Sequence, residues 1–240
     1  MKDTIKKILA SFDIELRKIT NEENNASQLF KKHQLLYQKY RNYTMIPEKE
    51  FLDNLELCYS YRNIPGAIVE CGVWRGGMIA AIAETVGKDR TYYLFDSFEG
   101  LPEVKEIDGK AAQKWQANKE SPGYYDNCKA EEEYAEKAMT LAQVNKKHLV
   151  KGWFSNTLST YPADEKIAIL RLDGDWYEST MDCLTNLFDK VVPGGVILID
   201  DYYMWDGCSR AVHDFLSMRK ATERIQKSIN GVCYIQKNYD

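Results

Sequence analysis

Apolar residues are spaced in two different ways along this chain. From Ile5 to about Tyr40 they recur at helical intervals, interrupted by a polar stretch at residues 21–25, and a further helix is predicted at residues 47–61. After residue 66, short continuous apolar runs alternate with helical patterns, which is typical of buried parallel strands joined by helices. The sequence therefore predicts N-terminal helices followed by an α/β domain.

Apolar runs separated by helical patterns are predicted to be strands. The strands are expected at residues 67–72, 91–96, 148–151, 167–173 and 196–200, and the helices between and after them at residues 77–86, 135–144, 179–188 and 211–218. Two further extended runs, 221–227 and 231–236, are separated by a stretch that contains Asn230-Gly231, a strong hairpin signal. We therefore expect a doubly wound, mostly parallel seven-stranded sheet of the Rossmann-like kind, closed by a C-terminal antiparallel β-hairpin.

The domain organisation follows from the length of the chain and from one polar segment. A chain of 240 residues suits a single α/β domain, which we assign to residues 46–240, with residues 1–45 as an N-terminal helical extension. Residues 101–133 are polar and rich in Gly, Lys and Glu, which is typical of a lid over a site. The N-terminal helices either cover that site, mediate self-association or cap the sheet.

Composition narrows the function classes. The net charge of −4 and the scattered lysines give no general attraction to nucleic acid or to an anionic membrane. The first residues are charged and lack the apolar core of a signal peptide, and no apolar stretch approaches the ~20 residues of a membrane span, so we expect a soluble, cytoplasmic protein. The six cysteines form no Cys-x-x-Cys pair, which argues against zinc and against a disulfide framework.

Aspartates follow two of the predicted strands. Asp173 comes directly after one apolar run, and Asp200 and Asp201 come directly after the next. Open α/β sheets bind their ligands at these strand ends, and carboxylates that converge there with no lysine or arginine between them need a cation. We therefore predict that Asp173, Asp200 and Asp201 hold Mg²⁺, Ca²⁺ or Mn²⁺. The alternative is that they are helix N-caps and strand-end groups without a metal.

A glycine-containing turn and a later acidic residue point to a nucleoside cofactor. The first strand runs into residues 70–77, where Gly72 permits a tight turn with close approach of a ligand, although the glycines could also serve the turn alone. Asp96 ends the second strand, where a carboxylate can accept hydrogen bonds from both ribose hydroxyls. The pattern is not the Gly-x-Gly-x-x-Gly of dinucleotide enzymes, so S-adenosylmethionine fits better than NAD.

Several longer motifs resemble the macrocin O-methyltransferase family, whose members methylate sugar hydroxyls of macrolide and aminocoumarin antibiotics. These motifs occupy residues 70–77, 96–102, 152–154, 170–180, 193–195 and 199–202, and the resemblance extends from about Thr44 to the C-terminus. It implies a class I methyltransferase fold, S-adenosylmethionine, and a divalent metal, usually Mg²⁺, at Asp173, Asp200 and Asp201. The cofactor residues assigned on this basis are Thr44, Glu70, Cys71, Gly72, Val73, Trp74, Asp96, Ser97, Phe98, Phe154 and Asp173.

The chain departs from the family in two places. Family members commonly have Thr where this chain has Cys71, which is expected to alter packing near the methionine of the cofactor more than chemistry. Residues 101–133 match the family's variable substrate lid in position and are not similar to it in sequence, so the acceptor cannot be inherited. The family resemblance and the N-terminal helices together favour a homo-oligomer.

The chemistry expected is methyl transfer to a hydroxyl of a sugar or glycosylated metabolite. Asp173 is the first candidate for the base that takes the hydroxyl proton, and His213 is a second, although a lone helical histidine is more often a packed or capping residue. Some aromatic residues could stack on a sugar or a flat aglycone, or equally pack the lid: Trp115, Tyr124, Tyr125, Tyr202, Tyr203 and Trp205. Three alternatives stay open: a catechol-type O-methyltransferase, an NAD-dependent oxidoreductase and a non-catalytic binding protein.

Overall fold

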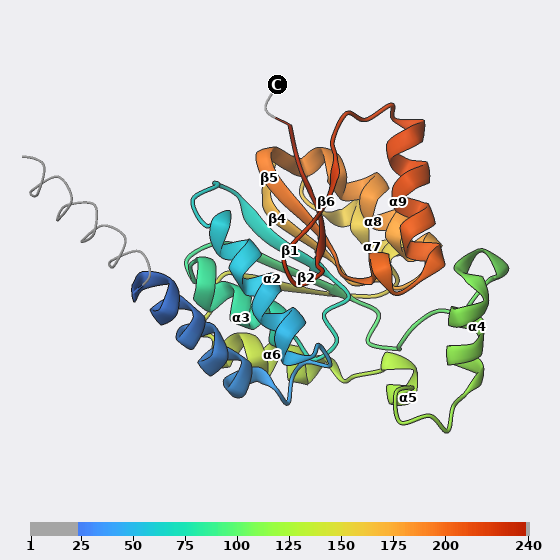
Figure 1. Cartoon of the computed structure of the whole chain (residues 1–240), viewed down its shortest axis with the longest axis horizontal. Helices are drawn as coiled ribbons and strands as arrows, with labels where there is room; N and C mark the ends of the chain where they lie inside the picture. The colour runs from blue at the N-terminus through green and yellow to red at the C-terminus, as the bar shows by residue number, and fades with distance from the viewer. Residues whose placement is uncertain (1–23, 239–240) are drawn as a thin grey trace, which may run out of the picture.

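The computed structural model describes residues 24–238, and these residues form a central sheet with helices on both faces (Figure 1). Residues 24–40 are helical, which confirms the second predicted N-terminal helix, while the first lies outside the described residues. The helix predicted at 47–61 is present as α2 (Glu48–Ser60) and begins after Pro47, whose missing N–H suits the start of a helix.

The seven-stranded sheet has the order β3-β2-β1-β4-β5-β7-β6, so the predicted fold is confirmed. The first five strands run parallel, and β7 pairs antiparallel with both β5 and β6. The strands are β1 (Ala67–Cys71), β2 (Tyr92–Asp96), β3 (Lys147–Lys151), β4 (Ile167–Leu172), β5 (Val191–Ile199), β6 (Ile225–Lys227) and β7 (Cys233–Gln236). Every residue of β1 and β4 is buried, as expected for strands covered on both faces.

Two apolar clusters fix the helices to the two faces of the sheet. Residues 24–40, α2, α3 (Gly77–Val86) and α6 (Glu132–Leu141) pack on one face. Helices α7 (Phe154–Thr157), α8 (Tyr177–Leu187) and α9 (Asp206–Met218) pack on the other. Helices α4 (Gly109–Ala117) and α5 (Tyr125–Cys128) lie in the segment between β2 and α6 and project from the sheet (Figure 1).

The two largest differences from the predicted boundaries are the starts of β5 and α9, each five residues earlier than predicted. Strand β5 begins at Val191, which pairs with Ile167, so the predicted turn at residues 193–195 lies inside the strand. A register shift in β4 and the positive φ of Gly194 accommodate these residues, and Lys237 pairs with both Gly194 and Gly195. Helix α9 begins five residues before the predicted start, at Asp206.

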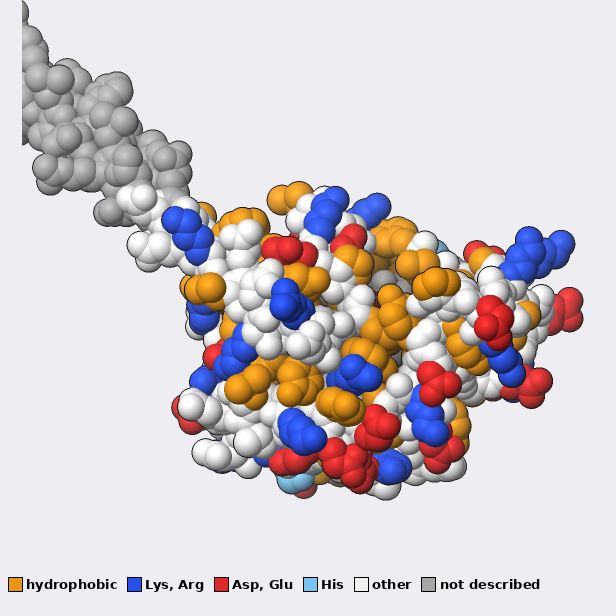
Figure 2. Space-filling view, turned by 90° about the horizontal axis from the view of Figure 1, so that it is seen from below, with side chains coloured by type: hydrophobic (Ala, Val, Ile, Leu, Met, Phe, Trp, Pro, Cys, Tyr) orange, Lys and Arg blue, Asp and Glu red, His pale blue; other side chains and the backbone are white. Residues whose placement is uncertain are grey.

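The surface agrees with the charge pattern of the sequence. The face shown in Figure 2 carries acidic and basic side chains interspersed, with no basic stripe across it. Within residues 24–238, no helix combines the length and the apolar character that a membrane span requires. The assignment of residues 1–45 as a separate extension and of residues 101–133 as a substrate lid stays a prediction.

Candidate active site

A cavity of about 790 Å³ opens at the carboxyl ends of β1, β2, β4 and β5. The turn after β1, residues 101–128 and the β6–β7 turn all contribute to its lining. This is the edge of an open α/β sheet at which ligands bind, because neighbouring chain connections diverge there. The sequence-based placement of the site is therefore consistent with the cavity.

Glycine is required where the first strand ends. A Cβ atom on Gly72 would lie 1.7 Å from the backbone oxygen of Asp173, and the φ of Gly72 is +87°. The turn after β1 therefore passes directly against the turn after β4, and only a residue without a side chain permits this approach. As a result, the glycine turn and the first acidic residue share one wall of the cavity.

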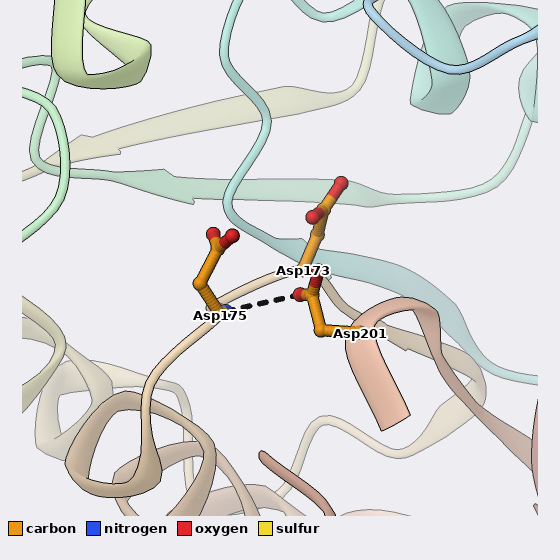
Figure 3. Close-up of side chains that lie close together, drawn as sticks. All are labelled: Asp173, Asp175 and Asp201. Atoms are coloured by element: carbon orange, nitrogen blue, oxygen red, sulfur yellow. Dashed lines mark hydrogen bonds between the residues drawn. The ribbon is translucent and has the colours of Figure 1, made fainter. Parts of the chain in front are cut away.

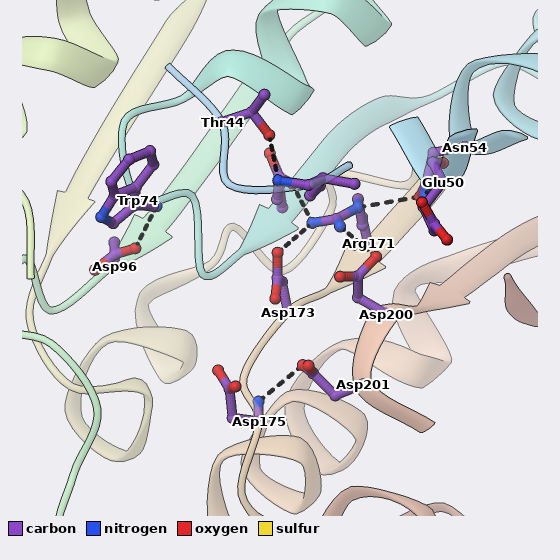
Figure 4. Close-up of polar contacts among 12 residues, drawn as sticks. Thr44, Glu50, Asn54, Trp74, Asp96, Arg171, Asp173, Asp175, Asp200 and Asp201 are labelled. Carbon is purple, nitrogen blue, oxygen red and sulfur yellow. Dashed lines mark hydrogen bonds and ion pairs between the residues drawn. The ribbon is translucent and has the colours of Figure 1, made fainter. Parts of the chain in front are cut away.

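The carboxylate of Asp96 binds the backbone of two residues with positive φ, Trp74 in the same wall and Phe98 in the apolar cluster beside it. Asp96 accepts a hydrogen bond from the backbone N–H group of Trp74 (2.8 Å, Figure 4) and another from that of Phe98 (2.7 Å). Trp74 and Phe98 have φ values of 47° and 56°, a region that residues with side chains rarely adopt. Burial raises the pKa of Asp96, while these backbone hydrogen bonds oppose the shift.

The predicted cofactor residues fall into two groups. Most of them line the cavity: Thr44, Glu70, Gly72, Val73, Trp74, Asp96, Ser97, Phe154 and Asp173. Cys71 and Phe98 are buried in the two apolar clusters and are not among the lining residues. Their contribution would be indirect, through the packing of the residues beside them.

Arg171 lies between the acidic residues, which corrects the expectation that no lysine or arginine separates them. Its guanidinium is 2.7 Å from Asp173 and 2.5 Å from Asp200 (Figure 4), and 2.6 Å from Glu70. It also donates to Asn54 of α2 (3.2 Å). Arg171 is 1 % exposed, so one buried cation neutralises part of the acidic charge below the cavity.

The carboxylates that lie closest together are not the set read from the sequence. Oxygen atoms of Asp173, Asp175 and Asp201 lie within 4.8 Å of one another (Figure 3), while Asp200 points to Arg171. Asp175 has a φ of 57°, and its backbone N–H donates to Asp201 (3.0 Å). Sequence reasoning assigned no role to Asp175, although its place two residues after Asp173 was a usable signal.

The pKa values of this cluster reflect burial and mutual repulsion. Burial raises the pKa of Asp173 to about 6, with the nearby Asp200 adding to the shift and Arg171 opposing it. Burial and the neighbouring carboxylates raise the pKa of Asp175 to about 8 and raise the pKa of Asp201 as well. A divalent cation would relieve this repulsion, and carboxylate oxygens are the donors that Mg²⁺ and Ca²⁺ prefer, so the donor set fits such an ion.

His213 lies apart from the acidic cluster. It is exposed on α9, its Nε2 atom is 2.9 Å from the hydroxyl of Tyr202, and it is not among the residues that line the cavity. The structure therefore offers no direct contact between His213 and a ligand in the cavity. Its role as a second base stays a prediction with less support than that of Asp173.

A family model described as macrocin-O-methyltransferase (TylF) matches residues 4–237 of the chain. The chain belongs to the macrocin O-methyltransferase family. It is 39% identical over 181 residues to demethyldecarbamoylnovobiocin O-methyltransferase of Streptomyces niveus, covering 72% of this chain and 67% of that protein. It is 32% identical over 194 residues to mycinamicin III 3''-O-methyltransferase of Micromonospora griseorubida, covering 76% and 74%.

Solved structures agree with this family assignment. The O-methyltransferase NovP superposes with a TM-score of 0.67 at 34% identity, covering 82% of this chain and 83% of that one. The calicheamicin methyltransferase CalS11 superposes with a TM-score of 0.57 at 22% identity, covering 86% and 91%, and supports the fold alone. Membership in the macrocin O-methyltransferase family identifies the chain as an O-methyltransferase.

Aromatic residues form much of the remaining cavity wall in this family member. Of those singled out in the sequence, Trp115, Tyr125, Tyr203 and Trp205 line the cavity, while Tyr124 and Tyr202 do not. Trp115 also packs within residues 101–133, with its ring 5.4 Å from that of Tyr124. Stacking on a ligand and packing of the lid are therefore both compatible with Trp115.

Proposed function

We propose that this enzyme transfers a methyl group from S-adenosylmethionine to a hydroxyl of a sugar on a glycosylated small molecule, with a divalent cation bound at the acidic cluster. The main observation in support is that Asp96, Gly72 and the clustered aspartates line one cavity. Relatives support the acceptor class, since one from Streptomyces olivaceus, 37% identical to this chain, is named as the 4'-O-methyltransferase of a dimethoxyrhamnosyl tetracenomycin. The mycinamicin relative is named for a 3''-O-methylation.

The wall beside β1 and β2 has the groups that S-adenosylmethionine requires. Asp96 lies where the ribose hydroxyls of a nucleoside are bound in open α/β sheets. Glu70 is buried at the cavity, and its Oε2 atom has no hydrogen-bond partner among the described residues. We infer that Glu70 accepts a hydrogen bond from the ammonium group of the methyl donor, because a buried carboxylate oxygen without a partner is costly.

Asp173, Asp200 and Asp201 stay our proposed metal ligands, with Asp175 as the additional carboxylate that the structure brings into the cluster. A bound Mg²⁺, Ca²⁺ or Mn²⁺ would supply a Lewis acid that lowers the pKa of the acceptor hydroxyl and orients it. The negative charge of these residues would also attract the positively charged methyl donor.

Asp173 is the proposed base. Its Oδ2 atom accepts a hydrogen bond from Arg171 (2.7 Å), which fixes the carboxylate at the end of β4 beside the glycine turn. In the transfer, the acceptor oxygen forms a bond to the methyl carbon while the carbon–sulfur bond breaks, leaving S-adenosylhomocysteine. The hydroxyl proton passes to the Asp173 carboxylate.

Replacing Asp173 tests this assignment. Asp173→Asn is expected to reduce turnover by at least about 10²-fold, as loss of a general base typically does, while the dissociation constant for S-adenosylmethionine changes little. Asp182→Asn is the matched control, because Asp182 is another carboxylate of the cavity wall outside the cluster, and we expect it to keep measurable turnover. Turnover by Asp173→Asn at the rate of the unchanged enzyme would remove Asp173 from the mechanism.

A panel of acceptors separates this proposal from its alternatives. The enzyme would be incubated with S-adenosylmethionine and one of three additions: glycosides with free sugar hydroxyls, aromatic diols, or no acceptor. Methylated products would be identified by mass spectrometry. Methylation of diols alone would favour the catechol-type reaction. Binding of the methyl donor without transfer to any acceptor, even in a single turnover, would favour a non-catalytic binding protein. Self-association through the N-terminal helices also stays a proposal, which sedimentation would test.

A further inference from the structure

The first half of the segment between β2 and α6 is held against the loop that follows β4. Asp108 is 3 % exposed, and its Oδ1 atom accepts a hydrogen bond from the backbone N–H of Tyr177 (2.8 Å). The indole N–H of Trp176 donates to the backbone oxygen of Pro102 (3.1 Å). These contacts join residues 102–108 to the loop that carries Asp173 and Asp175.

Three tryptophans pack together beside this contact, and two of them, Trp115 and Trp205, line the cavity. The rings of Trp176 and Trp205 are 5.4 Å apart, and the ring of Trp115 is 6.0 Å from each of them, all in edge-to-face arrangements. Trp115 comes from α4, Trp176 precedes α8, and Trp205 precedes α9. We call these residues the tryptophan triad. Since edge-to-face aromatic contacts depend on orientation, movement of α4 would alter the packing of Trp205.

Trp205 connects the tryptophan triad to the acidic cluster by a direct hydrogen bond. Its indole N–H donates to Oδ1 of Asp175 (3.0 Å), and its backbone N–H donates to the backbone oxygen of Asp201 (3.0 Å). Asp175 in turn donates its backbone N–H to the carboxylate of Asp201. Trp205 therefore contacts Trp115 of α4 and two residues of the acidic cluster, Asp175 through its indole and Asp201 through its backbone.

We propose that Trp205 is a positioning residue, which orients the Asp175 carboxylate within the acidic cluster and links cation binding there to docking of α4 through Trp115. The inference rests on the proposed cation site. Linkage of this kind is reciprocal: if docking of α4 strengthens cation binding, the cation must strengthen docking of α4 by the same factor. Groups that orient metal-binding side chains typically change metal affinity by about 10- to 100-fold when they are removed.

The test uses Mn²⁺ and the full chain without S-adenosylmethionine. Trp205→Phe removes the N–H donor and keeps an aromatic ring against Trp115 and Trp176. We expect it to weaken Mn²⁺ binding, measured by calorimetry, by about tenfold. Trp153→Phe is the matched control, since Trp153 also lines the cavity and makes no indole hydrogen bond to the described acidic residues, and we expect its Mn²⁺ affinity to stay within about twofold.

Hydrogen exchange of residues 109–117 gives the second readout. Mn²⁺ is expected to slow exchange of these amides in the unchanged protein and to have a much smaller effect in Trp205→Phe. Trp176→Phe, which removes the bond to Pro102, is expected to speed exchange of these amides and to weaken Mn²⁺ binding as well.

The outcomes separate this inference from the proposed function. If the unchanged protein binds Mn²⁺ and Trp205→Phe binds it equally well, or if Mn²⁺ leaves the exchange of α4 unchanged, the inference is wrong and the cation site stands. If the unchanged protein does not bind Mn²⁺, the cation site of the proposed function is wrong and the inference fails with it. Methyl transfer measured after removal of divalent ions would then show whether the O-methyltransferase activity itself persists.

Discussion

Replacing Arg171 with methionine should destabilise the protein far more than replacing an exposed arginine. Arg171 is buried, and its guanidinium faces the carboxylates of Glu70, Asp173 and Asp200 at 2.5 to 2.7 Å. Methionine fills a similar volume, so the main effect is the loss of the cation. The cost of the lost cation is largest at Glu70, because its side chain is only 2% exposed. Asp173 and Asp200 are 27% and 24% exposed and keep contact with water.

The magnitude follows from the cost of an unpaired buried charge. Removing one partner of a buried ion pair typically costs about 3–5 kcal/mol, which is a large share of the roughly 5–15 kcal/mol that stabilises a folded domain. Arg171→Lys should cost less, because lysine keeps the charge but cannot contact three carboxylates through a planar fork. Adding Glu70→Gln to Arg171→Met should recover part of the loss, since the most deeply buried negative charge is then absent.

The loss of stability caused by Arg171→Met should also depend on pH in a defined direction. Burial raises the pKa of Glu70 to about 7, above its value in the unfolded chain, so the folded state binds more protons and stability falls as pH rises between these values. Without Arg171 the pKa of Glu70 rises further and this window extends upward. The destabilisation by Arg171→Met should therefore be smaller at pH 6 than at pH 8, by at most about 1.4 kcal/mol per pH unit.

Urea unfolding at both pH values measures these differences. Arg219→Met is the control, because Arg219 pairs with Asp189 at 2.5 Å with both side chains largely exposed (41% and 63%), where the loss of a pair costs at most about 1 kcal/mol. If Arg171→Met lowers the free energy of unfolding by less than about 1 kcal/mol, or by the same amount at pH 6 and pH 8, this role of Arg171 is refuted.

Two further predictions concern the stability contributed by buried residues other than Arg171 and its carboxylate partners. Asp53→Ala removes a buried acceptor of hydrogen bonds from Ser228 and Val232 of the β6–β7 turn, so we expect the free energy of unfolding to fall by about 1–3 kcal/mol, seen as a lower Tm. Asp53→Asn should lower it less. Equal Tm values for Asp53→Ala and the unchanged protein would contradict this prediction. Burial lowers the pKa of His33 to about 4, so the unfolded chain takes up the proton first and stability should fall as pH decreases from 6.5 to 4. His33→Gln should show a shallower fall in urea unfolding over this range, and parallel stability curves would exclude His33 as the cause.

Much of the fold could be predicted from local pattern, because buried parallel strands consist of continuous apolar runs. The segments 67–72 and 167–173 illustrate this, and the Asn230-Gly231 signal correctly indicated the hairpin. Strand β5 was harder to delimit, since Pro193 and two glycines resemble a turn and the strand extends through them by the pairing of Val191 with Ile167. That pairing is tertiary, so no local pattern contains it.

The candidate site was predictable in position and less so in detail. The aspartates predicted at strand ends line the cavity, because their place in a parallel sheet fixes the edge at which they emerge. Arg171 was not expected among them, since its neighbours are apolar and its carboxylate partners come from three different segments. Asp175 and Trp205 are 30 residues apart, and only the folded chain shows that their side chains form a hydrogen bond.

The insertion of β7 between β5 and β6 has a consequence for synthesis of the chain. Strand β5 is apolar and buried over most of its length, yet its second neighbour is made only after α9 and β6 have followed it. Until residues 233–236 leave the ribosome, β5 presents unpaired N–H and C=O groups to other nascent chains, an arrangement that promotes aggregation. On this side of the finished sheet, the edge strand is β6, whose three residues include Lys227, and so short and charged an edge resists such pairing.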